Sequence, residues 1–451
     1  MKMLTTAINH GIVIDSQNKT KKQLHVGIQG DKIAVLSETP LEAEEVIDAG
    51  GLVVSPGFID PHGHVDGELY AGELSVCQGI TTTVGGNCGY SPEDMGEFFK
   101  EQERKGFPIH QAMLIGHGIP LRNRAGVYDR YKPACDEEIE IMKETARKAF
   151  QDGACGVSFG LDYVPGCSIR EVVELARLCA EYGKICPIHT RLLTNEDLYS
   201  LYELILVARE TKADILISHF VYQYCGGLCD PGLKMLEKAQ KEGLNIHIDS
   251  GMYTNWTTYF DTATFDLNNI QNNNWKFSQM VVATGKYKGQ VMDEELYFRM
   301  KEECPHEAVI FFEGIEDEIY ECLKKPYAMP STDIGAYDKG EGHPQIAGTY
   351  PRYFREMVRE RKLLTLEEAV HKATYLPAKV FKMEDKGVIL PGKDADITVF
   401  DPAEICDTAT YPHMGLPDAR PRGIPYVLVA GETAVKEGIY TGSRSGRPIR
   451  K

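Results

Sequence analysis

The sequence predicts an α/β protein with a (β/α)8 TIM-like barrel and a small composite β-sandwich domain built from both ends of the chain. Two patterns predict this fold. Eight short apolar runs alternate with helical or loop segments between residues 56 and 385, and strand-like runs occur in residues 1–55 and 386–451. The length of 451 residues fits one large and one smaller domain.

Each end of the chain contains too few strands to form a stable sheet alone. In the first 55 residues, the apolar runs 25–29 and 33–36 flank Gly30-Asp31-Lys32, which is a hairpin turn signal. Pairing the two ends would bury the apolar faces of both, so residues 1–55 and 386–451 are expected to form the β-sandwich domain. The runs expected near the C-terminal end are 387–390, 396–400 and 426–430.

The middle of the chain, residues 56–385, is expected to form the barrel. Helical patterns at 169–182 and 195–209 separate some of its strands. The segment at about 255–323 is too long for one crossover and therefore predicts an insertion. The eight expected strands are 57–60, 81–84, 112–115, 156–159, 185–188, 215–218, 244–247 and 327–330.

Composition and charge exclude several classes of protein. The 49 basic and 66 acidic residues give a net charge of −17, which provides no electrostatic footprint for nucleic acid or an anionic membrane. The sequence has no signal-peptide pattern and no apolar run of membrane-helix length. Its 12 cysteines are therefore expected to be reduced thiols in a cytoplasmic protein.

Residues that can bind metal ions follow the expected strands with unusual regularity. A single histidine in such a place is more often a satisfied polar residue than a ligand, and a single aspartate is more often a helix cap. Together, however, five such side chains and a carboxylate, each just past a strand of one barrel, would converge at one point. The polar residues at the strand ends supply the candidates. They are Asp60, His62, His64, Cys88, His117, His189, His219, Asp249, Tyr253 and Asp333.

This combination of residue types indicates metal-assisted hydrolysis. Thiolate and imidazole ligands favour Zn²⁺, and a catalytic zinc keeps one position open for water. Binding lowers the pKa of that water toward about 7, and a nearby carboxylate can then take its proton.

Several longer motifs point to one family. The chain resembles the D-aminoacylase (N-acyl-D-amino-acid deacylase) family of the amidohydrolase superfamily along nearly its whole length. The His-x-His motif marks only the superfamily, whereas the Asn87-Cys88-Gly89 and Gly348–Arg352 segments are more particular. The matching stretches are 56–64, 86–91, 116–118, 160–166, 189–191, 218–219, 331–333, 348–352, 392–396 and 441–447.

The resemblance implies a role for each of these residues. Cys88, His189 and His219 correspond to the ligands of a tightly bound zinc, and His62 and His64 correspond to a second, weaker metal position. Asp333 corresponds to the general acid/base that serves a metal-bound hydroxide attacking the amide carbon. The end of the fourth strand offers no lysine, so a carbamylated lysine bridge like that of hydantoinases is not expected.

The chain departs from the family where the substrate carboxylate is held. Two cations of the family correspond to Val221 and to Gln345, which lies in His343-Pro344-Gln345. Either other cations (Arg191, Lys339 or Arg352) replace them, or the substrate has no free carboxylate. A tyrosine of the family corresponds to Tyr253. This residue lies in an aromatic stretch with Trp256 and Tyr259, which could equally line a substrate lid or pack on the surface of the insertion. The candidate substrate-binding residues are Tyr253, Arg191, His343 and Gln345.

The expected function is zinc-dependent hydrolysis of the amide bond of a small molecule, resembling that of D-aminoacylases. The alternative is a cyclic amidase that opens a hydantoin- or imide-like ring without a free carboxylate. A non-catalytic scaffold is disfavoured because all five ligand-type residues and Asp333 are present. A deaminase is disfavoured because such enzymes carry a different ligand set. The sequence leaves the oligomeric state open.

Overall fold

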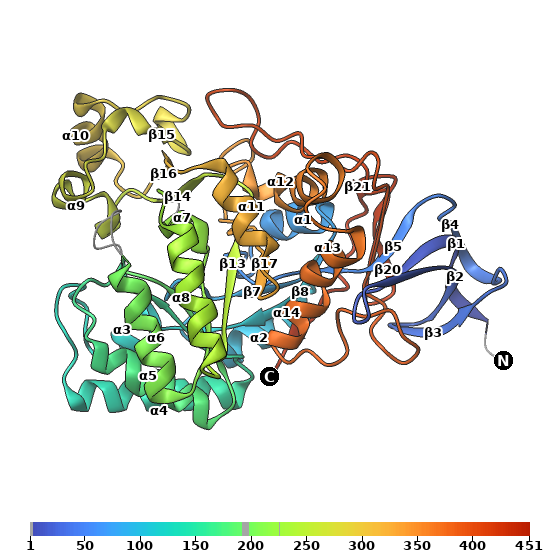
Figure 1. The fold of residues 1–451 in the computed structure, drawn as a ribbon, viewed down its shortest axis with the longest axis horizontal. Coiled ribbons are helices and arrows are strands. Elements are labelled where there is room, and N and C mark those ends of the chain that lie inside the picture. The colour runs from blue at the N-terminus through green and yellow to red at the C-terminus, as the bar shows by residue number, and fades with distance from the viewer. Residues whose placement is uncertain (1–2, 192–197, 225) are drawn as a thin grey trace.

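The computed structural model describes residues 3–191, 198–224 and 226–451, and Figure 1 shows how their elements are arranged. Parallel strands and helices form the centre of the molecule, and a mostly antiparallel sheet lies at one end. The α/β class predicted from the sequence is therefore confirmed.

Strands from both ends of the chain share one nine-stranded sheet. Its order is β21-β20-β19-β18-β5-β1-β2-β3, and β4 pairs with β1. The antiparallel pairing of β18 with β5 joins the two ends, while the sandwich form of this region stays a prediction. The strands are β1 (Leu4–Asp15), β2 (Thr20–Gln29), β3 (Lys32–Ser37), β4 (Ala43–Asp48), β5 (Val53–Pro56), β18 (Ile397–Phe400), β19 (Tyr426–Val429), β20 (Glu432–Lys436) and β21 (Ile439–Tyr440).

Two details of this sheet test the sequence patterns. The predicted hairpin is formed by β2 and β3, and Gly30 adopts a φ of 61° in its turn. The strand predicted at 387–390 is wrong, since these residues have no ladder partner. These residues are apolar because they are buried without pairing, as the low exposure of Val388 and Ile389 shows.

All eight runs predicted as barrel strands contain β-structure. The strands lie in two parallel sheets, ordered β17-β13-β12-β11-β10-β9 and β22-β8-β7-β6. Their bounds are β6 (Phe58–Asp60), β7 (Ile80–Gly85), β8 (His110–Met113), β9 (Ile115–Gly116), β10 (Val157–Gly160), β11 (Ile185–His189), β12 (Asp214–Ile217), β13 (Ile246–Ser250), β17 (Ala328–Pro330) and β22 (Pro448–Ile449).

Backbone hydrogen bonds bring the edges of these two sheets together. On one side, the N–H of Cys155, just before β10, donates to the carbonyl of Met113, at the end of β8, at 2.8 Å. On the other side, just past β6 and β17, the N–H of Asp333 donates to His62 O at 2.8 Å and the N–H of His64 donates to Ile334 O at 2.8 Å. The segments that follow these strands therefore meet in one region.

Helices surround the parallel strands. The predicted helix 169–182 is α5, whose start is fixed by reciprocal hydrogen bonds between Ser168 and Glu171. The predicted helix 195–209 is α6, and positions 195–197 lie outside the described residues. The helices are α1 (Leu69–Cys77), α2 (Met95–Lys105), α3 (Arg122–Arg124), α4 (Asp136–Asp152), α5 (Ile169–Glu181), α6 (Tyr199–Thr211), α7 (Phe220–Tyr224), α8 (Cys229–Lys241), α9 (Leu267–Asn272), α10 (Glu294–Glu303), α11 (Glu316–Lys324), α12 (Gln345–Tyr353), α13 (Leu366–Ala373) and α14 (Tyr375–Val380).

A small unit interrupts the alternation after β13. It contains the antiparallel sheet β14 (Asn255–Tyr259), β16 (Ala308–Phe312) and β15 (Met280–Val282), together with α9 and α10 (Figure 1). Its aromatic side chains form a hydrophobic cluster of their own. The unit lies within the segment 255–323, where the sequence predicts an insertion.

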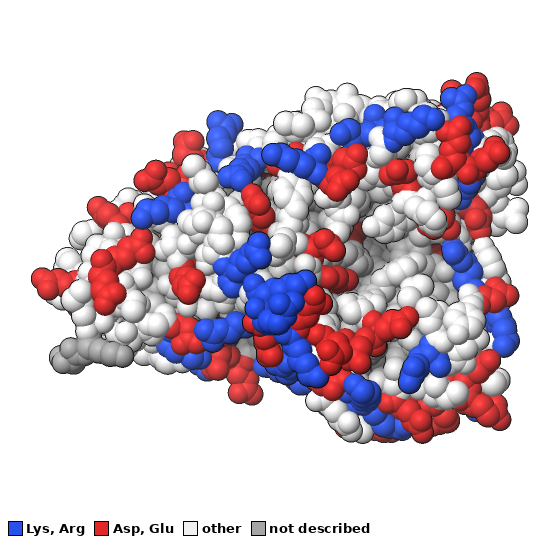
Figure 2. Space-filling view, turned by 180° about the vertical axis from the view of Figure 1, so that it is seen from behind, with Lys and Arg blue, Asp and Glu red and all other residues white. Residues whose placement is uncertain are grey.

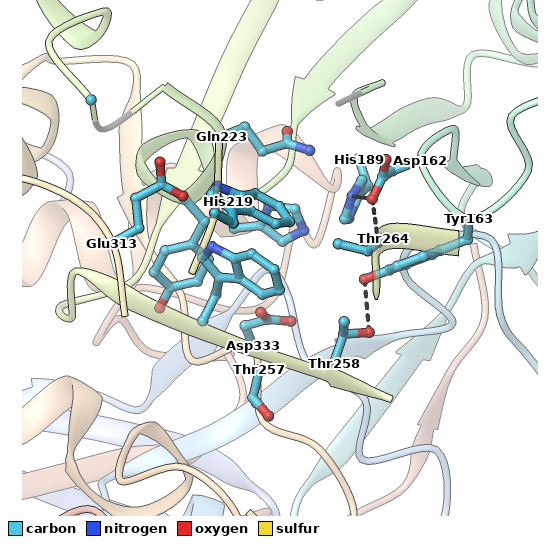
Figure 3. Close-up of a pocket in the computed structure, with 14 residues that line it drawn as sticks. Asp162, Tyr163, His189, His219, Gln223, Thr257, Thr258, Thr264, Glu313 and Asp333 are labelled. Atoms are coloured by element: carbon cyan, nitrogen blue, oxygen red, sulfur yellow. Dashed lines mark hydrogen bonds and ion pairs between the residues drawn. The ribbon is translucent and has the colours of Figure 1, made fainter. Parts of the chain in front are cut away.

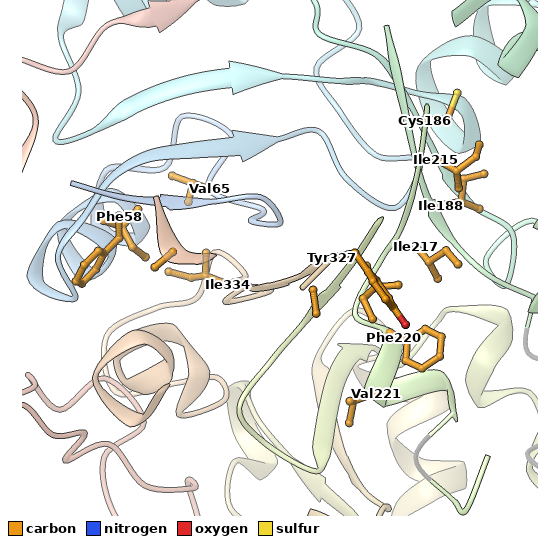
Figure 4. Packing of buried hydrophobic residues seen from close by; sticks show 14 of the residues in the cluster. Phe58, Val65, Cys186, Ile188, Ile215, Ile217, Phe220, Val221, Tyr327 and Ile334 are labelled. Atoms are coloured by element: carbon orange, nitrogen blue, oxygen red, sulfur yellow. The ribbon is translucent and has the colours of Figure 1, made fainter. Parts of the chain in front are cut away.

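The main hydrophobic cluster packs between the parallel strands and their helices. Figure 4 shows part of it, with Ile188, Ile215 and Ile217 from neighbouring strands beside Phe220 and Val221 of α7. Each of these five side chains has an exposed fraction of 0%. Close packing at this depth holds the strand ends, and the polar residues that follow them, in fixed positions.

The surface carries both signs of charge. On the face drawn in Figure 2, lysines and arginines are interspersed with aspartates and glutamates, without one continuous basic patch. In the part of the chain that the structure describes, none of the helices combines the length and the apolarity needed to cross a lipid bilayer.

Candidate metal centre and its pocket

Five predicted ligand residues and Asp333 meet at the carboxyl ends of the parallel strands. Cys88 Sγ lies 3.3 Å from His62 Nε2 and 3.5 Å from His219 Nε2. Asp333 Oδ1 lies 3.3 Å from His64 Nε2 and 3.4 Å from His62 Nε2. Residues far apart in the sequence thus form one cluster of nitrogen, sulfur and oxygen donors.

The cluster contains two overlapping groups that can each hold a metal ion. One group is His62, His64 and Cys88, and the other is Cys88, His189 and His219; within each group the ligand atoms lie within 4.8 Å of one another. Cys88 is common to both. The two groups match the division into two metal positions that the resemblance implies.

Three residues of the cluster have strained backbones. Cys88, His219 and Asp333 have φ values of 51°, 33° and 50°, in the left-handed region that residues with a Cβ rarely adopt. Each comes two or three residues after a strand, where this conformation turns the chain sharply. Such conformations persist where the surrounding structure fixes them, and they are concentrated at functional sites.

Two buried carboxylates support the cluster from behind. Asp249 Oδ1 accepts hydrogen bonds from His219 N at 2.9 Å and Ser331 Oγ at 2.6 Å, and its Oδ2 lies 3.4 Å from His62 Nδ1. Asp60 accepts hydrogen bonds from the backbone N–H groups of His62 at 3.2 Å and Thr332 at 3.1 Å. These contacts fix the segments after β6, β12 and β17 relative to one another.

Burial and neighbouring charge oppose each other in this cluster. Burial by itself raises the pKa of Cys88, but the charge of His62 and hydrogen bonds from His189 and His219 bring that pKa well below its usual value. Burial likewise raises the pKa of Asp333, and the hydrogen bond with His64 and the nearby histidine charges lower it overall. The surroundings therefore favour a thiolate and a carboxylate, which are the forms that bind cations.

A pocket opens onto the cluster between the strand ends and the inserted sheet. Figure 3 shows His189, His219 and Asp333 facing it, with Asp162 and Tyr163 on one side and Glu313 on the other. The side chain of Thr258, on β14, donates a hydrogen bond to Tyr163 Oη at 3.2 Å, so the inserted sheet contacts the segment after β10. The lining residues are Asp162, Tyr163, His189, His219, Tyr222, Gln223, Gly226, Trp256, Thr257, Thr258, Thr264, Trp275, Glu313 and Asp333.

The four predicted substrate-binding residues lie outside this lining set. Arg191 is paired with Glu203, at 3.0 Å between Nε and Oε2. Tyr253 packs edge-on against His343, whose Nε2 contacts Asn255 Oδ1 at 2.7 Å. Burial lowers the pKa of His343 to about 3, so this imidazole is neutral and supplies no cation.

Gln345 has a different environment from the one expected of a substrate ligand. Its Nε2 donates to the backbone carbonyl of Asp333 at 2.6 Å, and its Oε1 accepts from Tyr222 Oη at 3.1 Å. The side chain is fully buried. Gln345 therefore contacts the backbone of the catalytic candidate Asp333.

His117 follows a strand but does not join the metal cluster. Its ring packs against Phe159, with 5.1 Å between centroids, and its Nε2 lies 3.2 Å from Glu171 Oε2. Arg122 Nη1 donates to the same oxygen at 2.6 Å. A helical turn at His117–Leu121 directs this side chain toward Glu171 of α5 and away from the other strand-end residues.

Several pocket residues escaped the sequence patterns. Trp275 and Glu313 belong to the inserted unit, and Asp162 and Tyr163 lie in a segment that the sequence only matched as a motif. Trp256, in the aromatic stretch where a lid and surface packing were equally expected, lines the pocket. The aromatic content of the insertion was the one signal that could have pointed to these residues.

Comparisons with known proteins agree with this geometry. Residues 45–108 and 319–435 match the model described as "Amidohydrolase family". A D-aminoacylase from Alcaligenes xylosoxydans xylosoxydans is 29% identical to the chain, over 98% of this chain and 96% of the relative. An N-acyl-D-glutamate deacylase from the same organism is 30% identical, over 99% and 97%.

A solved structure is also similar over the whole chain. It is the N-acyl-D-glutamate deacylase from Bordetella bronchiseptica, complexed with zinc and a phosphonate inhibitor that mimics the tetrahedral intermediate of the reaction. The TM-score is 0.88 at 26% identity, and the match covers 100% of both chains.

Proposed function

Since the chain belongs to the D-aminoacylase family of amidohydrolases, we propose that it cleaves the amide bond of a small N-acylated substrate at the cluster around Cys88. It is a hydrolase of carbon–nitrogen bonds other than peptide bonds. One observation carries the proposal: a thiol, four imidazoles and the Asp333 carboxylate converge beside a pocket.

The donor set fits zinc. A thiolate and imidazoles are ligands that Zn²⁺ prefers, and the related deacylase from Bordetella bronchiseptica was solved with zinc. Cys88, His189 and His219 would hold the tightly bound ion, and His62 and His64 would hold a second, weaker one. Bound zinc supplies Lewis-acid chemistry, namely polarisation of the amide carbonyl and a lower pKa for water.

Asp333 moves the protons of the reaction. Its Oδ1 lies beside His62 and His64, and its side chain lines the pocket. From this position Asp333 Oδ1 takes a proton from the attacking water and passes it to the leaving nitrogen, so one carboxylate serves as base and then as acid. Asp249 and Asp60 keep the surrounding histidine segments in place.

The substrate follows from the family and from the pocket. The relatives deacylate D-amino acids according to their names, and an N-acyl-D-amino-acid-like substrate is our first candidate. A second candidate, a cyclic amide or other amide without a free carboxylate, is favoured by the lining of the pocket, because it includes neither lysine nor arginine among the described residues. Lys339, one alternative anchor, lines a different cavity beside Tyr337.

The finer architecture is also part of the proposal. We infer that the two parallel sheets close into one (β/α)8 barrel, which the bridge between Gly63 and Ile334 supports. The barrel would span residues 56–385 with the insertion at 255–323, and residues 1–55 and 386–451 would form the second domain, apart from β22, which pairs with β8. A cytoplasmic location is supported by the cysteines, which are free thiols wherever the structure describes them.

A hydrolysis screen tests the function. The zinc-loaded protein is incubated with N-acetyl-D-amino acids, N-acetyl-L-amino acids and neutral cyclic amides, and the products are measured by mass spectrometry. Cleavage that a chelator abolishes and added zinc restores is expected for at least one class. Cleavage that is insensitive to a chelator, or cleavage of none of these amides, would contradict the proposal.

A further inference from the structure

We infer that the pocket selects an amide substrate that carries a positively charged group, with Glu313 facing that charge. This inference rests on the proposed function, because it names the class of amide that the same site accepts. Three features of the pocket support it: the sign of its charged lining, its aromatic side chains and the engagement of nearby arginines elsewhere.

The charged side chains that line the pocket are acidic. Asp162, Glu313 and Asp333 contribute carboxylates, and the lining residues that the structure describes include no lysine or arginine. Asp333 faces the histidines of the metal cluster, and Asp162 lies 4.0 Å from His189 Nε2 and accepts a hydrogen bond from Thr264. These two carboxylates therefore belong to the catalytic end of the pocket.

Glu313 lies at a different end of the pocket. It directly follows β16, whose last residue, Phe312, pairs with Asn255 at the start of β14. Figure 3 shows the Glu313 side chain across the pocket from Asp162 and Tyr163. If the amide of a substrate lies at the metal cluster, the other end of the substrate would extend across the pocket toward Glu313.

Aromatic side chains also line the pocket. Trp256, Trp275 and Tyr222 all line the pocket, and aromatic faces attract ammonium and guanidinium groups. The pocket thus offers aromatic surfaces that favour a cation.

The arginines that could hold an anion are engaged elsewhere. Arg191 pairs with Glu203 and donates to the carbonyls of Pro165 and Cys167. Arg352 lies over the ring of Tyr253, 4.8 Å from its centroid, and its Nη1 lies 3.7 Å from Asp407. An anionic side chain in the pocket would meet carboxylates without a compensating arginine, whereas a cationic one would be attracted to them.

A set of isosteric substrates tests the inference. The rates are measured for N-acetyl-D-lysine, N-acetyl-D-norleucine and N-acetyl-D-glutamate, each with a free and an amidated carboxyl group, on the zinc-loaded protein. We expect kcat/KM for the lysine amide to exceed that for the norleucine amide at least tenfold, and the glutamate amide to react slowest. Equal rates for lysine and norleucine, or a preference for glutamate, would overturn the inference.

Two variants test whether Glu313 causes the preference for the lysine substrate. Glu313→Gln should lower kcat/KM for the lysine substrate at least fivefold more than for the norleucine substrate. The control Glu302→Gln, which removes an exposed carboxylate from α10, should leave both rates unchanged. A lysine preference that survives Glu313→Gln would overturn the assignment of Glu313.

A binding measurement distinguishes failure of the proposed hydrolase function from failure of the charge inference. If none of the six amides is cleaved, calorimetric titration of the same amides still reports which charge the pocket binds. Tighter binding of lysine than norleucine would support the charge inference without the hydrolase proposal. Equal binding would overturn the charge inference as well.

Discussion

Two buried clusters in this molecule contain the same kinds of side chain but differ in their source of positive charge. Around Cys88, histidines, a thiol and Asp333 face one another beside a pocket. Around Glu171, His117 and Cys167 lie within 4.8 Å of the carboxylate. There the Arg122 guanidinium donates to Glu171 Oε2 at 2.6 Å.

The difference shows why residue types alone do not define a metal site. Arg122 gives the cluster around Glu171 a built-in cation, and it also donates to the carbonyls of Asp129 and Lys132. This cluster therefore ties a loop to α5. The cluster around Cys88 offers several donor atoms to one point, and we propose zinc as the cation that they bind.

The largest expected effect comes from removing the ligand shared by both metal groups. Cys88→Ala should lose most bound zinc and lower kcat at least a thousandfold, because the thiolate belongs to both groups. Zinc content is measured by mass spectrometry of the purified protein, and activity on the same samples. The matched control is Cys167→Ala, which should keep its zinc. If Cys88→Ala retained full zinc and activity, the ligand assignment would be wrong.

The next effect separates chemistry from metal binding. Asp333→Asn should lower kcat by about a hundredfold to ten-thousandfold, since an amide cannot carry the proton from water to the leaving nitrogen. The zinc content of the strongly bound position should stay at the wild-type value. Wild-type turnover in this variant would exclude Asp333 as the acid/base.

Disrupting the cluster around Glu171 should lower the free energy of unfolding. Arg122→Met leaves the Glu171 carboxylate buried without its cation, which is expected to cost about 3–5 kcal/mol in the free energy of unfolding. Zinc content should be unchanged. The control Arg209→Met breaks an exposed pair with Glu242 and should cost less than about 1 kcal/mol. Urea unfolding measures both, and equal losses would contradict the contrast between the clusters.

The same cluster predicts a dependence of stability on pH. Burial opposes ionisation of Glu171, but hydrogen bonds from His117 and the backbone outweigh it and lower its pKa from 4.5 to about 2. A depressed carboxyl pKa stabilises the fold above the unfolded value and loses that contribution as the pH falls. About 3 kcal/mol should therefore disappear between pH 4.5 and 2. Glu171→Gln, measured over the same range, should lack this component.

The smallest expected effect concerns Gln345. Gln345→Met removes the hydrogen bond to the Asp333 carbonyl, and kcat should fall about tenfold while KM and zinc content change little. Steady-state kinetics with metal analysis measure both quantities. A change confined to KM would indicate that Gln345 contacts the substrate instead.

Much of the fold was predictable because local patterns decide it. The eight predicted strands were recognised as short runs in β/α alternation, and all eight runs contain β-structure. The run at 387–390 has the same apolar character, yet it is buried without pairing. Burial and strand pairing leave similar marks in a sequence, so the pattern could not distinguish them.

The candidate site was predictable to the extent that strand ends determine it. Cys88, His189 and His219 lie at or just past strand ends and meet in one group. His117 also follows a strand, but its helical turn directs it toward Glu171. Glu313 and Trp275 reach the pocket from an inserted unit whose placement depends on tertiary packing. No local pattern carries that information.

The pairing of β22 with β8 has a consequence for how the chain is made. Pro448 and Ile449 lie alongside Gln111 and Ala112, and the N–H of Arg447 bonds His110 across 337 positions of sequence. After the ribosome has synthesised His110, it must therefore add 337 further residues before Arg447 can bond to it. Until then the β8 edge is exposed to other nascent chains, and a chaperone that shields it during translation would raise the yield of native protein.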